Sequence, residues 1–482
     1  MITEPVLTLK TARPDVDQAF RIALGDIAGN VAPFHDGLLD TPAPVILAGL
    51  DYDTPWTRDA AINVWNGAGL LAPAVSRNTL LSVLRRDGNG GNAIRVGGQY
   101  WDAIIWVTGA WAYYLYTGDR EMLALAHEAT LNSLAYFEAT EFDADTGLFR
   151  GAAVYGDGVA AYPDRYATGG YGGIDHWAEH NPDKKHPVGE GVPMQTLSTN
   201  CVYYSAYLLA NRMAAELGRP RDEQLANKAA SLRKAINEKL WMAAAGRYRY
   251  FIDPWGGSDE QEGMGLSLAI LLGAADEQRA AAIFDSAHVT PAGFPCVWPT
   301  YPRYQKDDPS AIGRHSGTVW PHIQGFWGCA AAAHGRTNLF AHELNCLTAH
   351  ASRDAQFTEI YHPETHLPYG GVQECSREED PSGLFRWHSC RRQTWSATAY
   401  VRLVLMGLLG MRFDETGLSF APCVPEGFGE IRLTGLTWRD TVLDITLAGT
   451  GRRVESLTLG DAPVERIPAA LVGTHSVCVY TG

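Results

Sequence analysis

The sequence predicts a mainly α-helical protein that ends in a small β-domain. Apolar residues recur at helical spacing through most of the first 411 residues, and after Gly417 the pattern changes to strand-like alternation. The chain has 482 residues, which exceeds one module of about 100–150 residues and favours a large repetitive architecture.

Helical periodicity is clearest between Trp101 and Leu115, where apolar side chains follow the i, i+3, i+4, i+7 rule. This segment stops at Thr117-Gly118, a typical helix end, and Asp119 is placed to cap the next helix. Two long helices joined this tightly must be antiparallel neighbours. A helical hairpin is therefore the expected building unit.

Twelve segments of this kind follow one another along the chain. They cover about residues 16–28, 57–72, 76–87, 100–117, 119–139, 196–218, 220–239, 260–272, 276–288, 318–334, 336–351 and 391–411. Twelve helices in hairpins fit an (α/α)6 barrel with six inner and six outer helices. We therefore expect residues 1–416 to form an (α/α)6-barrel domain.

Residues 417–482 are expected to form a small β-sandwich-like domain, with strands near 431–438, 442–447, 454–459 and 476–480. Two long segments, 141–195 and 352–390, are rich in Gly, Pro and aromatic residues and fit no helix. Irregular segments of this length in a compact domain are usually functional loops.

Composition excludes several classes of protein. The net charge of −15 disfavours a nucleic-acid partner. Without a long apolar run or a signal-peptide pattern, we expect a cytoplasmic protein with no membrane partner. The eight Cys show no metal-ligand spacing, and Asp143 and Asp145 are typical of a plain turn. We expect no cofactor and no metal; the oligomeric state is open.

Aromatic and charged residues coincide at several expected helix starts. Such pairs suit a sugar site, because Arg and Asp bond neighbouring hydroxyls while Trp covers the ring face; capped helices and core packing would explain them equally. The candidate substrate-binding residues are Trp56, Arg58, Asp59, Trp101, Asp102, His315, Trp320 and Trp395.

Two carboxylates lie in the two long loops, Asp157 in the first and Glu359 in the second. Glycoside hydrolysis uses such a pair, one acid to protonate the leaving oxygen and one base to activate water. An Asp between two Gly is also typical of a turn, so Asp164 and Asp175 remain alternative acids.

Three motifs then occur in a suggestive order: Gly317-Thr-Val-Trp-Pro-His322, Thr358-Glu-Ile-Tyr361 and Gln393-Thr-Trp-Ser-Ala397. Together with Pro55-Trp-Thr-Arg-Asp59, this order resembles the six-hairpin (α/α)6 glycosidases. The similar groups are the bacterial glycogen-debranching and amylo-α-1,6-glucosidase-like proteins and glycoside hydrolase family 63. The resemblance implies an inverting mechanism, with Glu359 as the base and Asp157 as the acid.

The leading hypothesis is an exo-acting glycosidase on a short, α-glucoside-like substrate. We expect Tyr155, Val159 and Tyr162 to raise the pKa of Asp157, and Tyr361 or His362 to support the ionised Glu359. The alternatives are a glycoside phosphorylase, a sugar epimerase or polysaccharide lyase, and an inactive glycan-binding protein. The epimerase or lyase would use His side chains, for which His176, His180, His315 and His322 are candidates.

Overall fold

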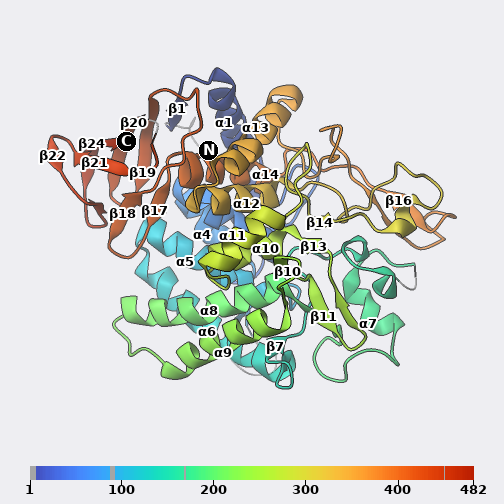
Figure 1. Ribbon diagram of the computed structural model, residues 1–482. Coiled ribbons are helices and arrows are strands. Elements are labelled where there is room, and N and C mark those ends of the chain that lie inside the picture. The colour runs from blue at the N-terminus through green and yellow to red at the C-terminus, as the bar shows by residue number, and fades with distance from the viewer. Residues whose placement is uncertain (1–6, 87–92, 168–169, 450) are drawn as a thin grey trace.

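The computed structural model describes residues 7–86, 93–167, 170–449 and 451–482. Figure 1 shows helices through the body of the molecule, a sheet of C-terminal strands on one side and long loops on the other. The prediction of a mainly α-helical chain with a small C-terminal β-region is confirmed. Within the described residues, no helix is both long and apolar enough to cross a membrane.

Within the described ranges, six helices contact one another in a closed ring, in the order α2, α5, α8, α10, α12 and α14 and back to α2. Their bounds are α2 Thr57–Asn63, α5 Trp106–Thr117, α8 Leu197–Glu216, α10 Gly263–Leu271, α12 Pro321–Ala333 and α14 Thr394–Arg402. The π-helical turns η1 (Val64–Ala68) and η7 (Leu403–Leu408) extend α2 and α14. α5 is buried from Trp106 to Tyr116, as expected of a helix covered on all sides.

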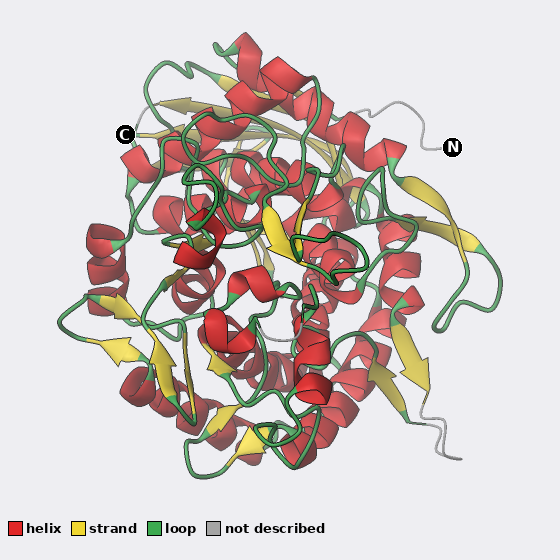
Figure 2. Cartoon of the chain, turned by 90° about the vertical axis from the view of Figure 1, so that its right-hand side faces the viewer, coloured by secondary structure: helices red, strands yellow, loops and turns green. Residues whose placement is uncertain are grey.

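A second set of helices packs outside this ring. Its members are α1 Pro14–Gly29, α4 Pro73–Ser82, α6 Arg120–Thr140, α9 Glu223–Lys239, α11 Glu277–Ser286 and α13 Thr337–Asp354. α9 buries Leu225, Ala229, Leu232 and Ile236, which form one apolar stripe at helical spacing. Figure 2 shows helices arranged around a centre that loops and short strands cover.

The predicted helix 76–87 is wrong at its C-terminal end. α4 ends at Ser82, and strand β4 (Leu84–Arg86) pairs with β5 (Ile94–Val96), so hairpin pairing replaces helix at these residues. Residue 87 lies outside the described residues. The other predicted helices match observed ones to within a few residues.

The C-terminal strands form a six-stranded sheet in the order β1-β19-β20-β24-β21-β22. The strands are β1 Thr8–Lys10, β19 Ile431–Trp438, β20 Thr441–Gly449, β24 Gly473–Thr481, β21 Val454–Leu459 and β22 Ala462–Pro463. A three-stranded sheet joins β17 (Met411–Phe413), β18 (Gly417–Phe420) and β23 (Ile467–Pro468). β1 and β17 precede residue 417, and the division at 416 stays a prediction.

The two predicted loops contain only short elements. The first carries β6 (Phe142–Asp143), β7 (Leu148–Phe149), three single 3-10 turns and helix α7 (Trp177–His180); the second carries β15 (Val372–Glu374) and β16 (Leu384–Arg386). The other short strands are β2 Val31–Phe34, β3 Ala43–Ile46, β8 Gln195–Thr196, β9 Trp241–Met242, β10 Arg247–Tyr248, β11 Phe251–Asp253, β12 Gly256–Ser258, β13 Gln261–Glu262 and β14 Val297–Trp298.

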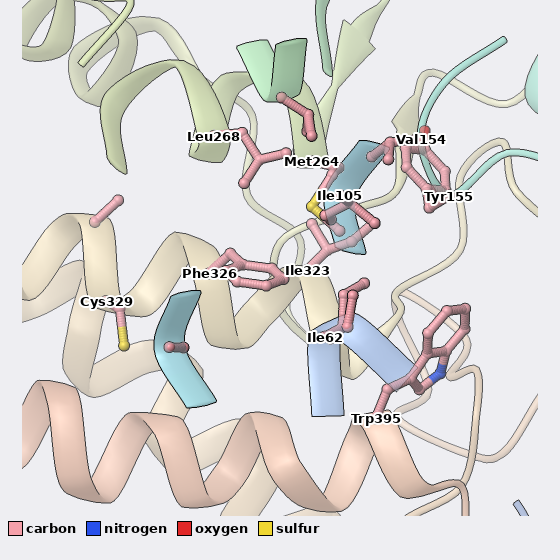
Figure 3. Close-up of a cluster of buried hydrophobic side chains, with 14 of the residues drawn as sticks. Ile62, Ile105, Val154, Tyr155, Met264, Leu268, Ile323, Phe326, Cys329 and Trp395 are labelled. Carbon is pink, nitrogen blue, oxygen red and sulfur yellow. The ribbon is translucent and has the colours of Figure 1, made fainter. Parts of the chain in front are cut away.

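An apolar cluster fills the middle of the helical ring. Figure 3 shows Ile62, Ile105, Met264, Ile323 and Phe326 converging from α2, α10, α12 and the segment before α5. All five side chains are fully or almost fully buried. The ring is therefore a packed core and not an open channel.

Candidate active site

A cavity of about 500 Å³ opens where the ring helices begin. This volume lies within the usual range for small-molecule sites. Its lining includes Trp56, Arg58, Asp59, Asp102, Asp157, Asp175, Arg314, Trp320, Glu359 and Trp395. Arg58 and Asp59 lie in the first turn of α2, Trp56 and Trp320 directly precede α2 and α12, and Trp395 lies in the first turn of α14. Tyr155 and Trp395, which Figure 3 places beside the apolar cluster, close the floor.

The first turn of α2 delivers three of these side chains. Trp56 directly precedes α2 with φ of 38°, a left-handed conformation that a bulky residue rarely adopts. Arg58 and Asp59, in contrast, are buried. Strained residues of this kind cluster at functional sites, and Trp56, which is 51% exposed, lines the cavity.

Asp157 is held by Arg58. Arg58 Nη2 donates to Asp157 Oδ2 at 2.6 Å, and Arg58 Nη1 donates to Asp102 Oδ2 at 3.3 Å. The glycines beside Asp157 allow a close approach, because a Cβ on Gly158 would collide with Gln373 and His315. The Gly-Asp-Gly segment is thus packed against the second loop and is more than an exposed turn.

The expectation that local apolar residues raise the pKa of Asp157 is wrong. Burial does act to raise it, but the Arg58 guanidinium, with a smaller effect from Arg314, outweighs burial and lowers the pKa of Asp157 below its usual value. The Asp157 side chain remains 44% exposed, so it is accessible from the cavity mouth.

Glu359 has two strong hydrogen-bond donors. Tyr52 Oη donates to Glu359 Oε1 at 2.9 Å, and Arg314 Nη2 donates to Glu359 Oε2 at 2.9 Å. The expected support from Tyr361 or His362 is wrong: the Tyr361 hydroxyl accepts from the Thr358 backbone N–H, and His362 Nδ1 accepts from the backbone N–H groups of Glu364 and Thr365. A carboxylate held by a guanidinium and a phenol is fixed in orientation, as a general base requires.

Two further carboxyl groups lie beside Arg58. Burial raises the pKa of Asp59 to about 8 and that of Asp102 to about 7, although Arg58 opposes both shifts. The Oδ1 atoms of both residues are buried and have no hydrogen-bond partner in the protein. A buried carboxyl oxygen without a partner is unfavourable when ionised, which agrees with the raised pKa values of both groups.

Two histidines stack behind the cavity wall. His315 stacks on Trp320, with ring centroids 4.8 Å apart, and its Nε2 lies 3.7 Å from Asp157 Oδ1. His322 stacks on Trp395 at 4.0 Å. Burial lowers the pKa of His315 to about 3 and also lowers that of His322, so both rings are neutral near pH 7.

Not every candidate residue reaches the cavity. Trp101 is 1% exposed and packs edge-on against Tyr100, so it belongs to the core, and His315 lies behind the wall. Of the alternative acids, Asp175 lines the cavity, whereas Asp164 is exposed and pairs with Arg303. His176 and His180 are also outside the lining.

Sequence reasoning missed several lining residues, namely Tyr52, Gln99, Arg314, Gln373, Trp387 and Gln393. Arg314 directly precedes the motif that begins at His315, and Gln393 opens the Gln-Thr-Trp motif. For Arg314 and Gln393, this position next to or within a motif was the sequence signal that could have identified them as lining residues. Within the described ranges, no group of three His, Cys, Asp or Glu side chains is arranged to share a metal ion.

Comparison with known proteins agrees with this geometry. Residues 102–396 match the mannosylglycerate hydrolase MGH1-like glycoside hydrolase domain. Residues 411–465 match the C-terminal domain of glycosyl hydrolase family 65. No curated protein sequence matches the chain.

Several solved structures share the fold. The GH63 mannosylglycerate hydrolase from Thermus thermophilus, in complex with Tris and D-glycerate, is 15% identical with a TM-score of 0.58, over 80% of this chain and 100% of its own. A GH78 rhamnosidase from Bacillus sp. GL1 is 16% identical with a TM-score of 0.58, over 100% of this chain and 44% of its own. A sialidase is 14% identical with a TM-score of 0.62, over 90% of this chain and 37% of its own. The chain therefore spans less than half the length of the last two proteins.

The fold and the matched domain define a glycoside hydrolase. More particularly, the chain belongs to the family of mannosylglycerate hydrolase MGH1-like glycoside hydrolases. The resemblance to six-hairpin glycosidases is thereby confirmed.

Proposed function

We propose that this chain is an inverting, exo-acting glycoside hydrolase that uses Asp157 as general acid and Glu359 as general base. The observation that carries the proposal is the arrangement of the two carboxylates. Asp157 and Glu359 come from separate long loops, line one cavity and are each held by a different arginine. This is the pair of groups that an acid–base hydrolysis of a glycosidic bond needs.

The assignment of the acid rests on accessibility. Asp59 and Asp102 are buried below Arg58, whereas Asp157 and Asp175 are each nearly half exposed near the mouth. In an exo-acting enzyme the terminal sugar fills the closed floor and the leaving group points outward. A mouth-side carboxyl group is therefore better placed to protonate the leaving oxygen. Asp157 is favoured over Asp175 because Arg58 Nη2 fixes its orientation at 2.6 Å, whereas the contact of Asp175 with His176 is 3.9 Å long.

The remaining lining residues suit a sugar ring. Trp56 and Trp387 line the cavity and are half exposed, so their indole faces can cover a sugar ring, and the lining residues Asp59 and Asp102 supply carboxyl groups for neighbouring hydroxyls. We place this site at one end of an (α/α)6 barrel, with the six ring helices inside and the second set outside. Short α-glucoside-like compounds are the first substrates to test.

The test is the Glu359→Gln variant, compared with Glu364→Gln. Glu364 lies in the same loop but is exposed and does not line the cavity. An amide cannot accept a proton from water, so Glu359→Gln should lose about 10²–10⁴-fold in kcat, while Glu364→Gln keeps its activity. Sugar release from aryl glycosides and disaccharides is the assay, run with and without phosphate.

The stereochemistry is read by NMR of the anomeric proton during hydrolysis. Inversion predicts that the first product has the anomeric configuration opposite to that of the substrate. Retention would refute the mechanism, a strict need for phosphate would favour a phosphorylase, and near-normal turnover by Glu359→Gln would remove Glu359 as the base.

A further inference from the structure

The charges on the cavity wall are unevenly balanced. The charged side chains are the two arginines Arg58 and Arg314 and five carboxyl groups, Asp59, Asp102, Asp157, Asp175 and Glu359. Among the described residues the wall has no lysine, and the two histidines behind it are neutral near pH 7. Burial raises the pKa of Asp59 to about 8 and that of Asp102 to about 7, so these two groups carry at most part of a negative charge near pH 7. Asp157 and Glu359 are each paired with an arginine, and among the described lining residues Asp175 is the carboxyl group without an arginine partner.

Both arginines are already committed to these carboxylates. Arg58 pairs with Asp157 and Asp102, and Arg314 pairs with Glu359 at 2.9 Å. The Arg314 guanidinium also lies over the rings of Trp320 and Trp387, at 5.4 and 5.0 Å. Neither cation is free to pair with a carboxylate of a substrate without giving up its present partner.

The cavity mouth is aromatic and acidic. Trp56 and Trp387 are half exposed there, and so are the side chains of the lining residues Asp157 and Asp175. The Asp175 side chain is 49% exposed, and its Oδ2 lies 3.9 Å from His176 Nε2. Two indole faces suit the apolar faces of a sugar or polyol, while Asp175 repels an incoming anion.

The geometry points to a substrate whose leaving group is uncharged, a sugar or a polyol, and to rejection of a leaving group that carries a carboxylate. This inference rests on the proposed function, because it identifies the substrate class of the same cavity. Asp175 is the specificity residue for this choice, acting from the mouth on the charge of the leaving group.

The test compares two glycosides that differ only in one group, a glycosyl glycerol and the matching glycosyl glycerate, each prepared with glucose and with mannose. At low ionic strength we expect kcat/KM to be at least about tenfold higher for the glycerol compound, since one unfavourable charge contact of about 1.4 kcal/mol changes a rate constant tenfold. Added salt should narrow the ratio, because it screens charges at an exposed mouth.

Asp175→Asn should also reduce the ratio of kcat/KM between the glycerol and the glycerate compounds. Asp164→Asn, in the same loop but outside the cavity, should leave this ratio unchanged. Binding of the same compounds to Glu359→Gln, measured by calorimetry, decides the charge preference without turnover. Equal or better binding or hydrolysis of the glycerate compounds overturns the inference, as does failure of both glycerol compounds to bind. Binding of the glycerol compounds without hydrolysis by the wild-type enzyme would instead count against the proposed function.

Discussion

Asp59 should cost the folded protein stability at neutral and alkaline pH. Its carboxyl group is buried, one of its oxygens has no partner, and burial raises its pKa to about 8. A carboxyl group whose pKa is higher in the folded than in the unfolded chain stabilises the fold fully only at low pH. That stability is lost as pH rises from about 4 towards about 8. Asp59→Asn removes this loss, because the amide stays neutral.

The magnitude follows from the two pKa values. The gap between 3.8 and about 8 corresponds to about 6 kcal/mol at about 1.36 kcal/mol per unit. An unfolding entropy of about 2.1 cal/mol/K per residue over 482 residues is about 1 kcal/mol/K. The ceiling on the gain in Tm is therefore about 6 °C, and we expect about 2–6 °C because Arg58 also loses a neighbouring charge.

Thermal unfolding of wild type and Asp59→Asn between about pH 4.5 and 8.5 is the assay, with Asp461→Asn at an exposed position as control. The difference in Tm should be close to zero at the acidic end and should grow as pH rises. The variant should also lose kcat/KM, since stability and site function compete at such residues. A Tm difference that does not depend on pH would refute the reasoning.

Three further outcomes are expected. Arg58→Gln removes the cation that lowers the pKa of Asp157, so the alkaline limb of kcat/KM should move to higher pH; an unmoved limb would exclude Asp157 as the acid. Gly109→Ala should lower Tm, because its Cβ would meet backbone of α2 at 2.7 Å, whereas Gly25→Ala in α1, with no neighbour within 4 Å, should raise it slightly. Trp56→Gly and Trp56→Ala should weaken glycoside binding equally. The Tm of Trp56→Gly should be the higher of the two, because glycine adopts the positive φ of this position without strain.

The helices could be predicted from the sequence because helical periodicity is a local signal. Strand β1 could not, because Thr8–Lys10 becomes a strand only by pairing with β19, which begins at Ile431. The end of α4 was missed for a similar reason, since Leu84–Arg86 gains its strand partner at Ile94–Val96. A strand of three residues is too short to show alternation by itself, so its pairing could not be read from the sequence, whereas the longer C-terminal strands could.

Site residues at helix starts could be predicted from sequence motifs. Contacts between side chains from distant segments could not. Trp56, Arg58 and Trp320 precede or open helices, and a single sequence marks these positions with Pro, Trp and Asp. Tyr52 reaches Glu359 across 307 residues, and Arg58 reaches Asp157 across 99. The pKa of Asp157 was misjudged because its local neighbours are apolar while its decisive neighbour is distant in sequence.

If Asp157 is the general acid, its pairing with Arg58 has a consequence for catalysis. In the free protein Arg58 holds Asp157 ionised, and it also contacts Asp102 from the floor side. A general acid must carry its proton when the glycosidic bond breaks. Water exclusion by a bound sugar would by itself strengthen the Arg58–Asp157 pair and keep Asp157 ionised. We therefore expect catalysis to need a sugar hydroxyl that accepts from the Arg58 N–H groups, because only a weaker Arg58–Asp157 pair raises the pKa of Asp157 towards that of a working acid.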